Sequence, residues 1–484
     1  MNKEVKIVVS ISEWNQLDEL SMLTDAIDLV EVRADLIDIA LVKGYTNKPL
    51  IYSLRSTEEG GSFKGSFEER KKLLLNAAKD YDYIELEGER DLVPELLNNI
   101  PEEKRRITWH GSSKNYSSLH EKLTKYLQTP ASLYKIVVHT NRHEDAVFTT
   151  CLLNAFSSDS IVAYAVGPMV KWTHVITPFL GAPEVPATIR SNTSSTYYFT
   201  PDQLIEHYGL PSVYPISQVF GIVGNPISTS ISPKLHNEAY RILGLPYLYL
   251  PFYAEDFQNF RNSIMENKNF PITLSGLTVV SPFKKNAYKA SKSTGNNDDT
   301  IAKACNGLVR EKNEWKGFST DALGAIETLN RVDNWKEKRI VIVGCGGTGQ
   351  TIAVALKKLG ITTTLVNRTI ENGERIATSL ELPFISLDKF QACFFDIIIH
   401  TTPLGKNSGE IPFDITQINS DSFVIDHVCP IGEKTELVKY CELCNIKVIG
   451  GRDIARIQIK QQFKCITGID SPNNEKIKHK LKIN

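Results

Sequence analysis

The feature that most constrains this fold is the alternation of two kinds of segment along the chain. Short runs rich in β-branched and aromatic residues alternate with longer charged segments of helical period. This alternation is typical of α/β architecture, in which helices join the strands of a mostly parallel sheet. An α/β fold is therefore predicted for the whole chain.

The first 200 or so residues are predicted to form a (β/α)8 barrel. About eight strands are expected there, and most intervals between them leave room for one helix. An open, doubly wound sheet is the alternative. The expected strands are Lys6–Ser12, Ile27–Asp35, Pro49–Ser56, Tyr83–Glu87, Arg106–Gly111, Leu133–Thr140, Ile161–Gly167 and Val185–Ile189.

Composition limits the classes of function. The chain has 484 residues and a formal net charge of −1, which argues against a protein that coats nucleic acid or an anionic membrane. No apolar run approaches the ~18 residues that cross a bilayer, and no targeting segment is recognised, so a cytoplasmic location is expected. Cys441 and Cys444 form a C-x-x-C, but a zinc site needs a second pair at matching spacing, so no metal is expected.

The rest of the chain is predicted to form two further α/β domains. Residues 208–218 have the composition of a linker, and a new strand, Val219–Gly224, follows them. The predicted domains are residues 1–212 for the barrel, 219–325 for a middle lobe and 326–450 for a last lobe. One helix is expected from Asp453 to about Ile466, before a polar, Lys-rich tail.

A glycine-rich loop predicts that the last lobe is a Rossmann dinucleotide-binding domain. The strand Arg339–Val343 leads into a G-x-G-x-x-G sequence, and the helix Thr351–Leu359 and the strand Thr362–Val366 follow. The glycines permit a tight turn, and the helix N-terminus offers N–H groups to a pyrophosphate. An ordinary turn with packing glycines is the alternative. The expected cofactor contacts in the loop are Gly344, Gly346, Gly347, Thr348 and Gly349.

The residues after the second strand of this lobe predict which dinucleotide binds. NAD-binding enzymes place an acid there for the ribose 2′-hydroxyl, whereas this chain has Asn367-Arg368-Thr369. Arg368 can pair with a 2′-phosphate and stack on adenine, so NADP is predicted over NAD. A solvated surface role for Arg368 is the alternative.

Polar motifs precede the glycine loop. Ser230 and Ser232 can grip a carboxylate, with a turn and helix cap as the alternative. After them come Thr278-Val-Val-Ser-Pro-Phe-Lys284, Cys305-Asn306-Gly and Ser319-Thr-Asp321, and later Gln458-Ile-Lys-Gln-Gln-Phe463. In this order, and together with the glycine loop and Asn367-Arg368-Thr369, these motifs resemble the shikimate dehydrogenase family over residues 219 to about 470.

That resemblance implies roles for the motif residues. Lys284 would donate a proton to the ketone oxygen as hydride arrives, and Asp321 would orient the lysine. Thr278, Asn306 and Gln458 would bind ring hydroxyls, and Ser230 and Ser232 would bind the carboxylate. The helix at about 451–470 would complete the middle, substrate-binding lobe.

The chain departs from this family's pattern at three places. The usual N-V-T before the lysine is Thr278-Val279-Val280, which lacks one hydroxyl, and the usual N-T-D is Ser319-Thr320-Asp321. The usual Y-x-P after a strand is His427-Val-Cys429-Pro430, without the tyrosine.

Charged residues in the predicted barrel strands indicate a second site. Burying a charge is costly unless the charge is paired or functional, and strand ends converge on the catalytic mouth of such a barrel. For any one residue, a structural salt bridge is the alternative. The residues concerned are Glu31, Arg33, Arg55, His110 and Lys135.

Together with Glu58-Glu59-Gly60-Gly61, these residues resemble type I 3-dehydroquinate dehydratase over roughly residues 5–208. The resemblance implies that Lys135 forms a Schiff base, its free amine favoured by burial next to other cations. His110 would move the substrate protons, and Glu59 would assist it or order a lid. Glu31, Arg33 and Arg55 would hold ring hydroxyls and the surroundings of Lys135.

The chain departs from this family's pattern at two places that concern binding of the substrate carboxylate. The family has S-R where this chain has Thr173-His174, and a later S-A-P-G-Q aligns with Ser194-Ser-Thr-Tyr-Tyr198. His174, with Lys171 or Arg190, is expected to replace the missing arginine. Ser194 is expected to contact the substrate.

The combined prediction is a bifunctional shikimate-pathway enzyme that uses NADPH and no metal. Its predicted partners are small molecules only: 3-dehydroquinate, 3-dehydroshikimate and shikimate. A quinate/shikimate dehydrogenase with a weakened dehydratase half is the first alternative. A non-catalytic metabolite sensor is the second, and it is disfavoured because both lysines and the glycine loop are present.

Overall fold

The computed structural model describes residues 3–22, 25–37, 42, 44–113, 115–189, 197–228, 230–291, 293–294, 304–430 and 434–472. The chain divides into two compact units, one of residues 1–221 with 233–274 and one of residues 222–232 with 275–484. Within the described ranges, no helix is both long enough and apolar enough to cross a membrane.

The first unit contains the predicted barrel. Eight parallel strands follow one another in the order β9-β2-β3-β4-β5-β6-β7-β8, so the open-sheet alternative is wrong. Each expected strand is present, with ends shifted by a few residues. The strands are β2 (Lys6–Ile11), β3 (Leu29–Arg33), β4 (Leu50–Ser53), β5 (Tyr83–Glu87), β6 (Arg105–Gly111), β7 (Leu133–His139), β8 (Ile161–Val166) and β9 (Glu184–Ala187).

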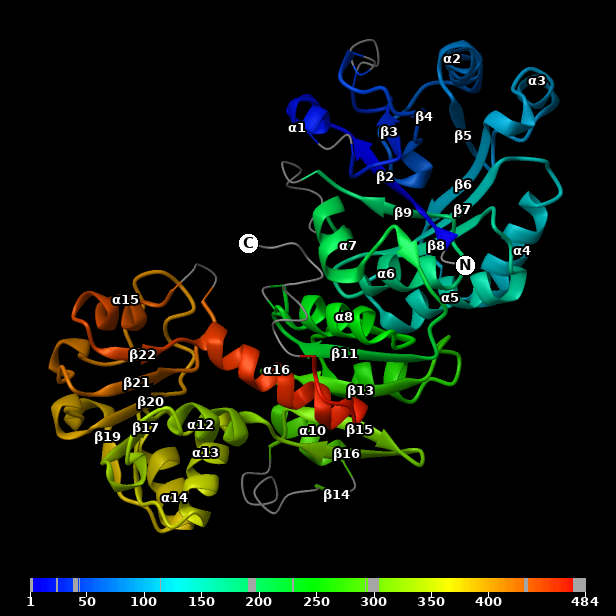
Figure 1. Cartoon of the computed structure of the whole chain (residues 1–484). Coiled ribbons are helices and arrows are strands. Elements are labelled where there is room, and N and C mark those ends of the chain that lie inside the picture. The colour runs from blue at the N-terminus through cyan, green and yellow to red at the C-terminus, as the bar shows by residue number, and fades with distance from the viewer. Residues whose placement is uncertain are drawn as a thin grey trace. The chain divides into compact units, whose positions relative to one another are not determined.

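Burial explains why these strands could be recognised. Every residue of β4 and of β8 is buried, because one face of each strand fills the barrel and the other lies under helices. Figure 1 shows α2, α3 and α4 outside the strands. The helices of this part are α1 (Gln16–Met22), α2 (Phe67–Asp80), α3 (Pro94–Leu97), α4 (Tyr116–Tyr126), α5 (His143–Phe156), α6 (Trp172–Phe179) and α7 (Pro201–Tyr208).

The segment predicted to be a linker has structure of its own. It contains the short strand β10 (Ser212–Val213), which pairs antiparallel with β1 (Lys3–Glu4) at the start of the chain.

A second sheet has six strands in the order β12-β11-β13-β15-β16-β14. β13 pairs antiparallel with β15, and β15 with β16. The strands are β11 (Gln218–Gly224), β12 (Tyr247–Tyr253), β13 (Leu274–Val279), β14 (Ser293–Thr294), β15 (Gly307–Glu311) and β16 (Glu314–Phe318). The helices are α8 (Ser232–Leu243), α9 (Phe257–Phe260), the π-helical turn Arg261–Met265 and α10 (Lys284–Ala290).

The third sheet confirms the predicted Rossmann fold. Its six parallel strands have the order β19-β18-β17-β20-β21-β22. That is the 3-2-1-4-5-6 order of dinucleotide-binding sheets, which bind ligand at the carboxyl ends of the first and fourth strands. The strands are β17 (Ile340–Val343), β18 (Thr363–Asn367), β19 (Phe384–Ser386), β20 (Ile397–His400), β21 (Phe423–Asp426) and β22 (Lys447–Ile449).

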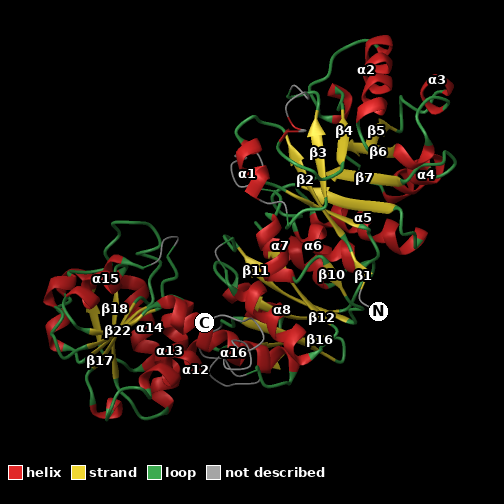
Figure 2. Ribbon diagram, turned by 45° about the horizontal axis from the view of Figure 1, so that its top comes forward, coloured by secondary structure: helices red, strands yellow, loops and turns green. Residues whose placement is uncertain are grey.

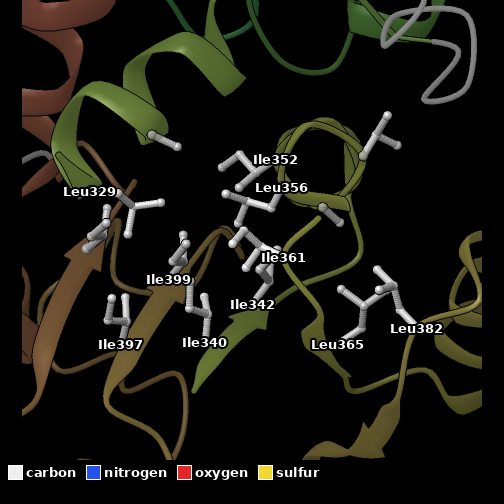
Figure 3. Close-up of a cluster of buried hydrophobic side chains, with 14 of the residues drawn as sticks. Leu329, Ile340, Ile342, Ile352, Leu356, Ile361, Leu365, Leu382, Ile397 and Ile399 are labelled. Carbon is white, nitrogen blue, oxygen red and sulfur yellow. The ribbon is translucent and has the colours of Figure 1, made fainter. Parts of the chain in front are cut away.

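This sheet is buried on both faces. Alternate residues of β17 enter two different clusters: Ile340 and Ile342 pack with α13, while Val341 and Val343 pack with α15. Figure 3 shows the first cluster, and Figure 2 shows helices around the strands. The helices are α12 (Asp321–Leu329), α13 (Gly347–Lys358), α14 (Ile370–Leu380), α15 (Glu436–Leu443) and the closing helix α16 (Gly451–Thr467).

Candidate active sites

Lys135 lies inside the barrel among charged groups from three neighbouring strands. It is a buried residue of β7. Its Nζ contacts Glu85 of β5 directly and lies 3.4 Å from Glu31 Oε2 of β3. Arg55 reaches the same two carboxylates, at 3.1 Å from Glu31 and 3.9 Å from Glu85. Ser53 Oγ donates to Glu85 at 2.8 Å, so this acid is fixed from two sides.

The charges around Lys135 have both signs. Cationic neighbours were expected, and Arg55 lies on the same two carboxylates, but the groups that Lys135 itself contacts are the carboxylates of Glu31 and Glu85. Burial raises the pKa of Glu31, but its ion pairs with Lys135 and Arg55 outweigh burial and lower that pKa to about 2. Glu31 is therefore ionised and forms an ion pair with the lysine.

His110 and Glu59 form a hydrogen-bonded pair near this lysine. Glu59 Oε2 accepts from the backbone N–H of His110 at 2.8 Å and lies 3.2 Å from His110 Nδ1. Burial, and then the nearby cations Arg55 and Lys135, hold the pKa of His110 well below its usual range. Burial, and then the Glu87 charge, raise the pKa of Glu59 to about 8. At neutral pH the imidazole is thus unprotonated and able to accept a proton.

Arg33 orders the loop that carries Glu59. Its guanidinium binds both oxygens of Asp35, at 2.8 and 2.7 Å, and Asp35 also accepts the N–H of Ser62 at 2.9 Å. The loop needs its two glycines, because Gly60 has φ +78° and a Cβ on Gly61 would lie 2.2 Å from Arg55 O. Arg33, which the sequence motif predicted to contact the substrate, therefore also orders the loop beside the site.

The structure does not support His174 as a cationic clamp for the substrate carboxylate. The ring is fully buried and Nε2–H donates to Ala165 O at 2.9 Å. Burial lowers the pKa of His174 to about 3, so the ring is neutral. It stacks on Tyr198 and meets Tyr164 edge-on, each with ring centroids 5.0 Å apart. Ser194 and Arg190 lie outside the described residues.

In the second half of the chain, Lys284 and Asp321 form the predicted pair. Lys284 Nζ lies 2.5 Å from Asp321 Oδ2. Lys284 begins α10, directly after a Ser-Pro-Phe turn, and Asp321 begins α12. Burial raises the pKa of Asp321, but the Lys284 charge outweighs burial and lowers it. The pair therefore rests as an ammonium and a carboxylate.

Two amides hold the other oxygen of Asp321. Asn306 Nδ2 donates to Oδ1 at 2.8 Å, and Gln458 Nε2 donates to it at 3.2 Å. Thr278 Oγ1 donates to Gln462 Oε1 at 3.4 Å, one helical turn from Gln458 on α16. The closing helix thus reaches this site, as the family motif implied.

The predicted serine pair forms a local contact. The N–H of Ser232 donates to Ser230 Oγ at 3.2 Å, at the start of α8. This is the geometry of a turn before a helix. The carboxylate-binding role of these serines stays a prediction.

The glycine loop has the shape that a pyrophosphate requires. Gly344 has φ +112°, and a Cβ on Gly349 would lie 1.9 Å from Gly344 O. A Cβ on Gly346 would meet no heavy atom within 4 Å, which leaves the backbone open at the N-terminus of α13. Asn367 Oδ1 accepts the N–H of Cys345 at 3.1 Å. These residues fit a dinucleotide phosphate group.

The segment after β18 also fits the predicted cofactor. Arg368 and Thr369 are exposed, no acid is present among Asn367-Arg368-Thr369, and Asn367 Nδ2 donates to Thr369 O at 2.8 Å. An exposed arginine at this place is free to meet a 2′-phosphate.

For three residues of these sites, the sequence did not predict the contacts that the structure shows. Glu85 lies in a predicted strand and carried the same signal as Glu31, a charge inside a strand. Thr348 was predicted to touch the cofactor, yet its hydroxyl contacts Lys284 at 2.9 Å and Asp321 at 3.2 Å. His427 lies close enough to this pair to interact with its charges. Burial outweighs the opposing Asp321 charge and, together with the Lys284 charge, lowers the pKa of His427 to about 4.

Family models match three successive parts of the chain. They are Type I 3-dehydroquinase over residues 7–213, Shikimate dehydrogenase substrate binding domain over residues 222–308, and Shikimate / quinate 5-dehydrogenase over residues 327–407.

Curated relatives match each half and the whole. The shikimate dehydrogenase (NADP(+)) of Syntrophobacter fumaroxidans is 31% identical over 43% of this chain and 70% of its own length. The bifunctional 3-dehydroquinate dehydratase/shikimate dehydrogenase, chloroplastic, of Arabidopsis thaliana is 23% identical over 96% of this chain and 81% of its own length. The pentafunctional AROM polypeptide of Scheffersomyces stipitis is 30% identical over 75% of this chain, which spans only 24% of that relative.

The fold and the two lysine-centred sites define a class of protein, a lyase-type barrel fused to a Rossmann dehydrogenase. More particularly, this chain belongs to the family of type I 3-dehydroquinate dehydratases fused to shikimate dehydrogenases.

Proposed function

We propose that the barrel converts 3-dehydroquinate into 3-dehydroshikimate, and that the second half reduces this product to shikimate with NADPH. The observation that carries the proposal is that each half holds one lysine against carboxylates, Lys135 on Glu31 and Glu85, and Lys284 on Asp321. The relative named for both activities, which matches nearly the whole chain, supports it.

In the dehydration, Lys135 attacks the C3 ketone and water leaves, which gives an iminium. For this attack, a proton of Lys135 passes to the carboxylate of Glu85, which the lysine contacts directly. His110 then removes the C2 proton and returns it to the C1 hydroxyl, which leaves as a second water. Hydrolysis of the iminium consumes one water, releases 3-dehydroshikimate and restores the amine.

In the reduction, bound NADPH would supply hydride to the ketone carbon. Lys284 donates a proton to the ketone oxygen, which becomes the new hydroxyl. Asp321 keeps the ammonium in place through Oδ2, and its Oδ1 is held by Asn306 and Gln458. These two amides also lie where ring hydroxyls of the substrate can reach them.

We assign NADP rather than NAD to the second half because of Arg368. The family relative is named for NADP(+), and the exposed arginine after β18 supports the same choice for this chain. Replacement of Arg368 by Asp is expected to move the preference toward NAD by at least tenfold in kcat/KM. Unchanged selectivity would mean that other residues recognise the 2′-phosphate.

A dehydrogenase with a weakened dehydratase half is the second candidate, favoured by the neutral, buried His174. Loss of a bidentate arginine costs about 2–5 kcal/mol of binding. Steady-state kcat/KM of the purified chain for 3-dehydroquinate, compared with its kcat/KM for 3-dehydroshikimate and for quinate, separates the two candidates.

Trapping tests the imine directly. Borohydride with 3-dehydroquinate is expected to leave a covalent adduct on Lys135, located by peptide mass spectrometry, and no adduct in Lys135→Ala. In the second half, Lys284→Ala is expected to abolish NADPH oxidation, while Lys285→Ala, at its exposed neighbour, is the matched control. A chain without an adduct, or with normal reduction in Lys284→Ala, would contradict the proposal.

A further inference from the structure

Thr348 belongs to the glycine loop yet contacts both members of the proton-donating pair. Its Oγ1 lies 2.9 Å from Lys284 Nζ and 3.2 Å from Asp321 Oδ2. An ammonium cannot accept and a carboxylate cannot donate, so the hydroxyl accepts from Lys284 and donates its single proton to Asp321. With the 2.5 Å ion pair, the three side chains form a closed ring of hydrogen bonds.

The backbone of the same turn lies against the lysine. A Cβ on Gly347 would be in ordinary van der Waals contact with Lys284 Cδ, at 3.9 Å, and with Ala304 Cβ, at 3.6 Å, so the turn packs against the stem of the lysine. The ammonium has three N–H groups. Asp321 and Thr348 use two of them, and the third is left for the ketone oxygen.

The turn that carries Thr348 is also the turn whose N–H groups suit a pyrophosphate. A phosphate bound there would fix the first residues of α13, and with them the hydroxyl that orients Lys284. We propose that Thr348 is a positioning residue that couples the cofactor loop to the proton donor, so that bound dinucleotide tightens the binding of shikimate. This inference rests on the proposed reduction in the second half.

The neighbouring polar groups do not connect the glycine loop to Lys284 as Thr348 does. Asn306 and Gln458 hold only the Oδ1 side of Asp321. His427 faces the pair, but no group in the described part of the chain hydrogen-bonds its Nε2. Within this cluster, therefore, the Thr348 hydroxyl is the direct link from the glycine loop to Lys284.

The test compares Thr348→Val, which keeps the shape and removes the hydroxyl, with Thr348→Ser, which keeps the hydroxyl. Calorimetry of the full chain would give the affinity for shikimate with and without saturating NADP+, and the rate of 3-dehydroshikimate reduction would be measured separately. We expect NADP+ to tighten shikimate binding about fivefold or more in the original chain and in Thr348→Ser, and hardly at all in Thr348→Val. We also expect Thr348→Val to lower kcat about tenfold, with KM for NADPH within about twofold.

Thr351→Val is the matched control, because the Thr351 hydroxyl donates to the carbonyl of Gly347, at 2.9 Å in the same helix, and contacts neither Lys284 nor Asp321 among the described residues. The circular dichroism spectrum and thermal midpoint of each full chain report that it is folded, and Thr348→Ala replaces the valine variant if that one does not fold. Full coupling and full kcat in the variant without the hydroxyl would overturn the inference, and so would an equal loss in Thr348→Ser. An original chain that does not reduce 3-dehydroshikimate would instead refute the proposed function.

Discussion

At the scale of single residues, the buried acid Glu59 makes stability depend on pH. Its folded pKa is about 8 because of burial and then the Glu87 charge, well above the ~4.5 of an unfolded glutamate. Between these two values the unfolded chain has released the proton and the folded chain has kept it. The contribution of Glu59 to stability is therefore present below about pH 4.5 and is lost as pH rises toward 8.

Glu59→Gln removes this titration. The variant is expected to match the original chain in thermal midpoint near pH 5 and to exceed it at pH 8, by on the order of a few kcal/mol of unfolding free energy. Dehydratase activity is expected to fall, because His110 loses its proton-sharing partner. Calorimetric scans at both pH values would measure the gap, and the exposed neighbour Glu58→Gln is the control. A gap that does not widen between pH 5 and 8 would contradict the raised pKa.

The sequence was most informative for residues whose chemistry is unusual where they stand. Lys135, His110 and Glu31 were recognisable as charged or titratable groups inside strand runs, and Lys284 and Asp321 through short motifs. The contacts of Glu85 and Thr348 depend on which strands and helices become neighbours, which no local pattern contains. The neutral state of His174 could not be predicted from its position in the sequence, because its charge depends on the carbonyl of Ala165 and on burial.

At the scale of elements, the buried parallel strands were predictable and the helix start in the glycine loop was not. Strands covered on both faces are continuous apolar runs, so β8 and β17 were found to within one residue. Helix α13 begins at Gly347, four residues before the expected Thr351. Glycines have low helix propensity, and here the turn is set by the close approach of Gly349 to Gly344.

Two glycines of this loop are expected to differ in their response to alanine. Gly349→Ala places a Cβ 1.9 Å from Gly344 O, so the backbone must move, at a cost of about 1–3 kcal/mol of stability. Gly346→Ala meets no heavy atom within 4 Å and has φ −74°, so stability should hold. It fills the space that a pyrophosphate needs, and the Kd for NADPH is expected to rise tenfold or more.

Thermal scans and NADPH titrations of both variants would test this contrast, with the circular dichroism spectrum of each full chain as the folding control. Equal midpoints for the two variants would mean that the loop adjusts to a Cβ at Gly349. Unchanged NADPH affinity in Gly346→Ala would mean that the cofactor does not approach this part of the backbone.

At the scale of the whole molecule, residues 233–274 pack with the barrel and not only with the lobe to which the sequence assigned them. Trp172 of α6 is fully buried, with its ring 5.9 Å from Phe252 and 5.4 Å from Phe270. Its Nε1 donates to His143 Nδ1 at 3.2 Å, and His143 Nε2 donates to Tyr253 O at 3.1 Å. No sequence pattern indicated that these aromatic residues, which are far apart in the chain, share a core.

Because of this shared core, we expect heating to inactivate the dehydratase and the dehydrogenase together. Trp172→Ala removes the ring on which both sides pack and leaves His143 Nδ1 without its donor, at a cost of about 3–5 kcal/mol. Because Phe252 and Tyr253 belong to β12 of the sheet that also contains β13, the damage should reach the dehydrogenase as well as the barrel.

We expect the midpoints of thermal inactivation of both activities, measured on the same heated samples, to fall by a similar amount. Trp14→Ala, at a tryptophan that is 45% exposed, should move neither midpoint. A Trp172→Ala chain whose dehydratase fails early while its dehydrogenase keeps the original midpoint would show that the aromatic cluster stabilises the barrel alone.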